Sequence, residues 1–311
     1  MNDTRPVALD FAVRTEALTK RYGDILAVDR LQLEIPAGQF FGLLGPNGSG
    51  KTTTIHMLST LVRPSSGRAA VAGHDVEQSA VPVRASIGLV FQDSALDRTL
   101  SIAQNLRFAG LLHNLPAKLI AARSAELLQL FDLNDKRDRP VGSLSGGMRR
   151  AVDIVRGVIH HPRILFLDEP TIGLDLPNRR KIWRFIERLR GETGMTVLLT
   201  THYLEEADGC DQVAFIKAGT IVDQGQPRAL VDRLAQHIVE IEGAEAGALN
   251  DPAVQRLGIP LQEGDLSMFR YADTDPAPLA ALQTQLAGRA RAVRIRRPNL
   301  NDVFLWVNAA Q

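Results

Sequence analysis

The stretch Gly45-Pro46-Asn47-Gly48-Ser49-Gly50-Lys51-Thr52-Thr53 matches G-x-x-x-x-G-K-[ST], the pattern of a phosphate-binding loop. An apolar run at 40–44 precedes the loop, and residues 53–63 have the composition of a helix. A strand before the loop and a helix after it distinguish a working nucleotide site from a chance match. The sequence therefore predicts that these nine residues bind a nucleoside triphosphate.

The spacing within the loop has a geometric reason. Glycines at 45, 48 and 50 let the backbone turn so that several N–H groups point at one phosphate. A helix that begins at Lys51 adds its positive dipole end, worth roughly half a charge. Lys51 can place a cation on the β- and γ-phosphates, and the hydroxyl of Thr52 can bind Mg²⁺.

The bulk composition limits the function classes. A chain of 311 residues exceeds the length at which single cores tend to split into domains. Its formal net charge of +1 argues against nucleic acid as the main partner. Cys210 is the single cysteine, which suits a reducing compartment. No apolar run approaches the ~20 residues that span a bilayer, and the first residues lack the apolar core of a signal peptide. We therefore expect that any membrane-spanning part belongs to another polypeptide.

Four short apolar runs are each followed directly by glycine or polar residues. Continuous apolar runs of this length predict buried parallel strands. They cover 40–44, 87–91, 164–167 and 196–199, and they are followed by the glycine loop, Gln92, Asp168-Glu169 and Thr200-Thr201-His202. Ligands of open α/β sheets bind outside the carboxyl ends of the strands. We therefore expect Lys51, Gln92, Asp168, Glu169 and His202 to converge on one sheet edge.

Other segments differ in character. Residues 11–35 alternate weakly around Tyr22-Gly23-Asp24, which predicts two strands joined by a turn. Leucine-rich residues between about 95 and 160 predict a helical insertion, and Ser145 is a candidate N-cap within it.

Beyond residue 230 we expect strands at 238–241, 266–271 and 292–296, with helical stretches at 252–257 and 279–286. Arginines crowd the last strand, where a solvated face is favoured over an anionic partner; they are Arg289, Arg291, Arg294, Arg296 and Arg297.

Together, the glycine loop, Gln92, Leu144-Ser145-Gly146-Gly147-Met148, the run ending in Asp168-Glu169, and His202 resemble the ATP-binding cassette ATPases of ABC transporters. The resemblance covers residues 12–227. Met148 and Arg149-Arg150 are similar to the branch of daunorubicin-resistance, ABC-2 type exporters, as is the terminal stretch at 298–305. The resemblance implies an α/β fold with a P-loop (RecA-like) core sheet, an antiparallel β subdomain and a helical insertion. A small C-terminal α+β domain would follow, giving domains at 1–230 and 231–311.

The resemblance also implies roles for the residues at the sheet edge. Asp168 would supply an oxygen ligand for Mg²⁺, usually through water, and Glu169 would orient or deprotonate the attacking water. His202 would bind the γ-phosphate and Glu169, and Gln92 would contact Mg²⁺ and the water. Tyr22 would stack on the adenine of ATP.

A second glycine-rich helix start, Ser145-Gly146-Gly147, would be a second anion site in a chain that has one phosphate loop. The resemblance implies a head-to-tail homodimer in which each of these segments covers the ATP held by the other copy. It further implies separate transmembrane permease subunits and a peripheral location on the cytoplasmic face of the plasma membrane. The cargo would be drugs, lipids or other small molecules.

Two alternatives remain. A soluble ABC-type ATPase acting on a cytosolic assembly usually carries two cassettes or a long basic or coiled-coil insertion, and neither is present. A P-loop kinase or GTPase is disfavoured by the Leu144–Met148 segment, and Asn134-Asp135-Lys136 is not a guanine-recognition motif.

Overall fold

The computed structural model describes residues 10–245, 247–273, 275 and 277–309. Contacts between residues divide the chain into two compact units. The first unit runs through Tyr203 and includes Gly209–Val222. The second contains Leu204–Asp208 and Asp223–Gln311.

The central sheet has six strands in the order β10-β9-β3-β8-β7-β6. The strands are β3 (Phe40–Leu44), β6 (Ile87–Val90), β7 (Ile164–Asp168), β8 (Thr196–Thr201), β9 (Gln212–Lys217) and β10 (Thr220–Gly225). Strand β3 runs parallel to β8 and β9, and β7 runs parallel to β6 and β8. Every residue of β3, β7 and β8 is buried, as expected for strands covered on both faces. The four strands predicted from apolar runs are confirmed.

A second sheet of the first unit has the order β2-β1-β4-β5. Its strands are β1 (Phe11–Tyr22), β2 (Ile25–Pro36), β4 (Ser66–Val71) and β5 (His74–Asp75). Strand β1 pairs antiparallel with both β2 and β4, and Tyr22 pairs with Ile25 across the predicted turn. Val13 and Leu33 of this sheet share one buried cluster with Phe41 of β3. The antiparallel sheet therefore packs on the core that also holds the start of the phosphate loop.

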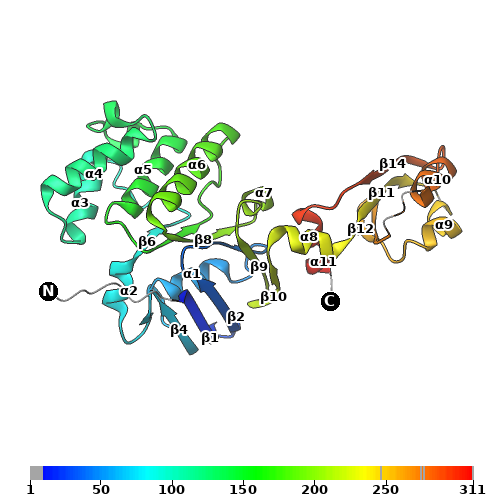
Figure 1. The fold of residues 1–311 in the computed structure, drawn as a ribbon, viewed down its shortest axis with the longest axis horizontal. Coiled ribbons are helices and arrows are strands. Elements are labelled where there is room, and N and C mark those ends of the chain that lie inside the picture. The colour runs from blue at the N-terminus through cyan, green and yellow to red at the C-terminus, as the bar shows by residue number, and fades with distance from the viewer. Residues whose placement is uncertain (1–9, 246, 274, 276, 310–311) are drawn as a thin grey trace. The chain divides into compact units, whose positions relative to one another are not determined.

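Helices surround the central sheet and include a group of three from the middle of the sequence. The helices of this unit are α1 (Lys51–Leu58), α2 (Ala80–Ser86), α3 (Ile102–Leu112), α4 (Ala117–Gln129), α5 (Gly146–Val158) and α6 (Leu176–Thr193), with short 3-10 turns η1 (Asn134–Lys136) and η2 (Val141–Ser143). Helices α3, α4 and α5 pack on one another and lie together in Figure 1. A capping box at Ser101 and Gln104 starts α3, and Ser145 caps α5. Local capping thus defines where these helices begin.

The second unit contains a four-stranded antiparallel sheet in the order β12-β13-β11-β14. Its elements are α7 (Leu204–Ala207), α8 (Pro227–Leu234), β11 (His237–Ala244), η3 (Ala248–Asn250), α9 (Pro252–Gln255), β12 (Leu261–Glu263), β13 (Leu266–Tyr271), α10 (Ala277–Gln285), β14 (Ala290–Arg296) and α11 (Leu300–Ala309). Val239, Phe269 and Leu282 belong to its own buried cluster. The three predicted strands and two predicted helical stretches are confirmed, and α8, α11 and β12 lie outside the prediction.

Most of the arginines on and beside β14 are paired within the second unit. Arg291 lies 2.5 Å from Glu242, and Arg289 lies 2.8 Å from Asp251. Arg296 binds both Glu240 and the buried Asp302 at 2.7 Å. These ion pairs support the interpretation of a solvated face, because the charges are already balanced by carboxylates of the same unit.

Candidate nucleotide-binding site

The phosphate loop leaves β3 and enters α1, the strand–loop–helix path that the sequence predicts. Gly50 forms the N-cap of α1 at φ +110°, in the left-handed region. A Cβ atom at Gly50 would lie 2.6 Å from the carbonyl oxygen of Ala27, so no other residue fits without a shift of backbone. The glycine thus lets the chain turn so that the first amides of α1 have no intrahelical partner. Such amides form an anion-binding site.

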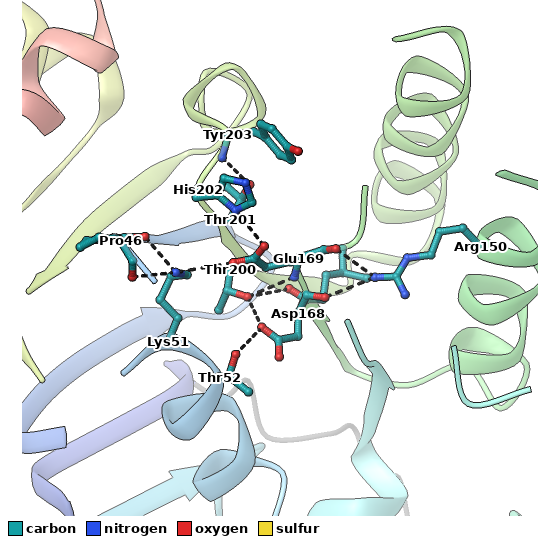
Figure 2. A network of polar contacts seen from close by, with 12 residues as sticks. Pro46, Lys51, Thr52, Arg150, Asp168, Glu169, Thr200, Thr201, His202 and Tyr203 are labelled. Carbon is teal, nitrogen blue, oxygen red and sulfur yellow. Dashed lines mark hydrogen bonds and ion pairs between the residues drawn. The ribbon is translucent and has the colours of Figure 1, made fainter. Parts of the chain in front are cut away.

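Lys51 lies on this turn and is 5% exposed. Its Nζ atom donates to the carbonyl oxygens of Gly45 (2.8 Å) and Pro46 (3.1 Å), and lies 3.6 Å from Oε1 of Glu169. Burial lowers the pKa of Lys51, and the negative charges of Glu169 and Asp168 oppose that effect. Figure 2 shows the ammonium group between the loop and the acids. The cation is therefore placed where a phosphate on the loop would meet it.

Asp168 is the last residue of β7 and is 2% exposed. Its Oδ1 atom accepts hydrogen bonds from Oγ1 of Thr200 (2.5 Å) and Oγ1 of Thr52 (3.1 Å). A carboxylate beside a hydroxyl on the phosphate loop is a set of hard oxygen donors of the kind that Mg²⁺ prefers together with phosphate and water. The donor set of Thr52 and Asp168 therefore fits Mg²⁺.

Glu169 follows in the left-handed region, at φ +45°. This conformation costs a non-glycine residue on the order of 1–2 kcal/mol and needs support from its surroundings. The N–H of Glu169 donates to the main-chain oxygen of Thr200 (3.0 Å) and to its Oγ1 (3.2 Å). The carboxylate lies between Lys51 and His202, with its side chain 8% exposed. The strained backbone thus directs a buried carboxylate toward the loop.

His202 comes directly after β8, and its Nδ1 atom lies 2.8 Å from Oε2 of Glu169. Thr200, two residues earlier, binds both Asp168 and Glu169. The structure therefore brings Lys51, Asp168, Glu169 and His202 together at one sheet edge, and it adds Thr200, to which the sequence analysis gave no role.

Gln92 and Tyr22 are placed differently. Gln92 lies just beyond β6, and its main-chain oxygen is 3.5 Å from Nη1 of Arg150. Within the described residues, its side chain makes no hydrogen bond to Thr52, Asp168 or Glu169. Tyr22 ends β1, is 45% exposed, and has Nζ of Lys20 4.9 Å from its ring centre. Their contacts with Mg²⁺ and adenine stay predictions.

The second glycine-rich segment starts α5, with Ser145 as its N-cap. Oγ of Ser145 accepts a hydrogen bond from the N–H of Met148 at 3.3 Å. A Cβ atom at Gly146 would meet nothing within 4 Å, and Ser145 and Gly146 are exposed. Within the part of the chain that the structure describes, nothing requires a glycine at 146. The open surface of this helix start therefore has room for a group from outside the chain.

Arg150, four residues into α5, is a residue whose role the sequence reasoning missed. It is buried, and its guanidinium donates to main-chain carbonyls next to Gln92 and at Asp168 and Glu169. The sequence signal was an arginine among apolar neighbours on the buried face of α5, where Ala151, Val152 and Ile154 are also buried. Buried arginines are rare unless they are paired, so this position indicates a specific set of acceptors.

Comparisons with known proteins agree with the geometry. A family model described as ABC transporter matches residues 28–172. A daunorubicin resistance ATP-binding protein of Streptomyces coeruleorubidus is 42% identical over 307 residues, covering 95% of both chains. A Nod factor export ATP-binding protein of Cupriavidus metallidurans is 40% identical, covering 92% of this chain and 93% of its own. The chain belongs to the ATP-binding cassette family of ABC transporters.

Solved structures of ATP-binding cassettes share the fold. The chain resembles cbiO1 of Clostridium perfringens, part of an ABC transporter complex, with a TM-score of 0.66 and 30% identity over 71% of this chain and 91% of that one. It also resembles a dimeric cassette bound to ADP and Pi in a post-hydrolysis state, with a TM-score of 0.64 and 26% identity over 69% and 98%. The ABC cassette described here thus binds ATP and is an ATPase, as the sequence predicts. None of its described helices has the length and apolar character needed to cross a membrane.

Proposed function

We propose that this cassette drives an ABC-2 type exporter of drugs, lipids or other small molecules as an ATP-dependent homodimer bound to separate membrane subunits. The observation that carries the proposal is the cluster at the phosphate loop in which buried Lys51 and Glu169 lie beside the partly exposed His202. The named relatives serve daunorubicin resistance and Nod factor export, which supports an exporter of small molecules.

In the proposed reaction, the phosphates of ATP lie on the amides of the loop, and Lys51 moves its donors from the carbonyls of Gly45 and Pro46 to the γ-phosphate. Glu169 orients and deprotonates the attacking water, because its carboxylate already points at the loop. His202 holds the carboxylate of Glu169 in that orientation.

The remaining site contacts belong to the same proposal. Thr52 and Asp168 would hold Mg²⁺, with Gln92 joining them, and the ion would neutralise charge on the phosphate oxygens. Tyr22 would stack on adenine. The loop residues Asn47, Ser49 and Thr53 would complete the contacts to the phosphates.

The dimer follows from the second helix start. Ser145, Gly146 and Gly147 present free amides but lie apart from the chain's own phosphate loop chemistry. A head-to-tail homodimer would place this segment on the ATP of the other copy. The dimeric cassette among the solved structures supports this arrangement.

An apolar surface of the first unit supports docking of a membrane subunit. Phe108, Leu111 and Leu112 of α3 are 61%, 50% and 68% exposed. Leu112 also lines a cavity of about 570 Å³ together with Leu61, Val81 and Phe91, and Phe91 precedes Gln92. Contiguous exposed apolar groups mark binding surfaces. A membrane subunit seated here would contact the strand end that carries Gln92, and the cassette would lie on the cytoplasmic face of the plasma membrane.

Binding of the purified protein to native membranes tests this proposal. Leu112→Asp should abolish co-sedimentation with membranes but leave ATP hydrolysis in solution intact. Ile25→Asp is the matched control, because Ile25 is 70% exposed on the antiparallel sheet. Equal membrane binding by both variants would reject α3 as the docking surface. A wild-type protein that hydrolyses ATP but never binds membranes would instead favour an ATPase of a cytosolic assembly.

A further inference from the structure

We propose that Arg150 is a positioning residue for ATP hydrolysis, one that fixes the backbone of the two strand-end acids and connects it to helix α5. This inference rests on the proposed role of Glu169 as the base. Arg150 is 7% exposed, and its guanidinium binds main-chain carbonyls of the two acids and of Pro170. Its effect would therefore be transmitted through Glu169.

The guanidinium group of Arg150 binds three consecutive carbonyls, beginning with that of the last residue of β7. Nη2 donates to the main-chain oxygens of Asp168 (3.2 Å) and Glu169 (3.3 Å), and Nε donates to that of Pro170. Figure 2 shows this side chain reaching the acids from the side opposite the phosphate loop. Three carbonyls that converge on one cation cannot rotate independently, so this contact fixes the turn that follows the strand.

The contact matters most at Glu169, whose backbone is strained. The N–H of Glu169 is held by Thr200, and its carbonyl is held by Arg150. With both flanking peptide groups fixed, the φ of +45° is maintained and the carboxylate stays directed at Lys51. Loss of the guanidinium would leave buried carbonyls without a donor, and rotation of either peptide would move the carboxylate.

The same guanidinium also holds the segment that carries Gln92. Nη1 donates to the main-chain oxygen of Phe91 and lies 3.5 Å from that of Gln92. The five N–H groups of arginine thus face five main-chain carbonyls from two loops. Because Arg150 lies five residues after Ser145, a displacement of the start of α5 would be transmitted directly to Glu169 and Gln92.

Lysine cannot reproduce this geometry, since it has three donors on one atom and a point charge. Arg150→Lys therefore keeps the buried cation but releases part of the carbonyl set. Arg188→Gln is the control, because Arg188 is an exposed arginine that pairs with Glu192 on α6 at 2.8 Å. Thermal unfolding of each variant reports whether the fold persists.

The experiment measures ATP affinity and the single-turnover rate of hydrolysis at saturating ATP for Arg150→Lys, alone and combined with Glu169→Gln. A misplacement of about 1 Å costs roughly 10²-fold in rate. We expect the rate of Arg150→Lys to fall about 30- to 100-fold, with ATP affinity within about 3-fold of the wild type. In the Glu169→Gln background the further loss should be less than about 3-fold, because residues that act as a unit are non-additive. Arg188→Gln should change the rate by less than about 3-fold.

Three results would overturn the proposal. They are an equal loss of rate in both backgrounds, a loss of ATP affinity as large as the loss of rate, and an unfolded Arg150→Lys chain, which would show a merely structural role. A wild-type rate in Arg150→Lys would count in the same way. The proposed base fails separately: if Glu169→Gln alone hydrolyses ATP at the wild-type rate, Glu169 is not the base and Arg150 has nothing to position.

Discussion

Two helices of the cassette begin at a glycine-rich segment, yet their surroundings are opposite. Helix α1 begins at Lys51, beside buried Asp168 and Glu169. Helix α5 begins at Gly146 on an exposed surface, with Ser145 as its cap. Both starts offer amides to an anion, but the first has the buried Lys51 on its first turn, in contact with Glu169, whereas Ser145 and Gly146 at the second are exposed.

The reason for the glycines differs as well. Gly50 is required by the chain itself, since its φ is +110° and the carbonyl of Ala27 lies where a Cβ would be. Gly146 has open space around it. Space within the described chain therefore does not require a glycine at 146, in contrast to Gly50. A phosphate brought by a second copy would supply a reason for glycine there.

The two helix starts therefore differ in the side chains beside them: α1 begins among buried charged groups, whereas the start of α5 is the one that we propose completes the ATP site of a second copy. Burial of Lys51, Asp168 and Glu169 together is costly, and their mutual contacts offset part of that cost. Such a cluster is kept where catalysis needs it. The start of α5 has no comparable cost and would act only when ATP of another copy approaches it.

Substitution of Lys51 by alanine should have the largest effect at the first helix start. The γ-phosphate would lose its cation, and we expect ATP hydrolysis to fall at least about 10³-fold. A phosphate-release assay measures this, with Lys136→Ala as the control, because Lys136 forms an ion pair with its neighbour Asp135. If Lys51→Ala hydrolyses ATP at the wild-type rate, the start of α1 does not supply the catalytic cation.

Glu169→Gln should reduce hydrolysis by about 10²- to 10⁴-fold, the usual contribution of a general base. The neutral isostere keeps the contacts of the loop, so ATP should stay bound and the homodimer should accumulate. Gel filtration with ATP detects the dimer, and exposed Glu187→Gln serves as the control. A monomer at saturating ATP would contradict the proposal that the start of α5 covers the ATP bound by another copy.

Mixing two inactive chains tests whether the two helix starts serve one site. Ser145→Arg fills the surface where the other copy's phosphate would dock, and Lys51→Ala disables the loop. A mixed dimer has one intact composite site, so activity should return on mixing in up to about half of the dimers by random pairing. Crosslinked mixed dimers that bind ATP at neither site would reject the shared site.

The sequence predicted the sheet edge because each strand there is a continuous apolar run followed by a functional residue. Strand β10 lies outside that prediction, since its residues are half-buried or exposed and form no apolar run. Strand β4 begins with three exposed residues, which hides it in the same way. Element boundaries agreed closely where capping residues such as Ser145 mark them.

Side-chain partners were harder to foresee than elements. Arg150 depends on carbonyls from segments 59 and 18–20 residues away, so no local pattern contains its role. Thr200 is one of two adjacent threonines at the end of β8, and composition alone does not say which of them binds Asp168. Whether Gln92 contacts Mg²⁺ depends on the conformation of its side chain, which no sequence pattern determines.

The smallest expected effect concerns the second unit, which we propose is an accessory module for regulation or partner docking. Residue 230, the proposed domain boundary, lies inside α8, so the informative truncation ends at Gly225, between β10 and α8, and retains α7. Each unit has its own buried cluster, and the arginines of β14 are largely paired with carboxylates of the same unit. We therefore expect the truncated chain to fold and to bind ATP with an affinity within about 2-fold of the full chain.

Titration with a fluorescent ATP analogue measures the affinity of the truncated chain for ATP. Gel filtration of truncated Glu169→Gln with ATP measures dimerisation, which should weaken. A folded truncation that no longer binds ATP would show that the phosphate loop at the start of α1 depends on residues beyond 225. The start of α1 would then be as incomplete by itself as the start of α5.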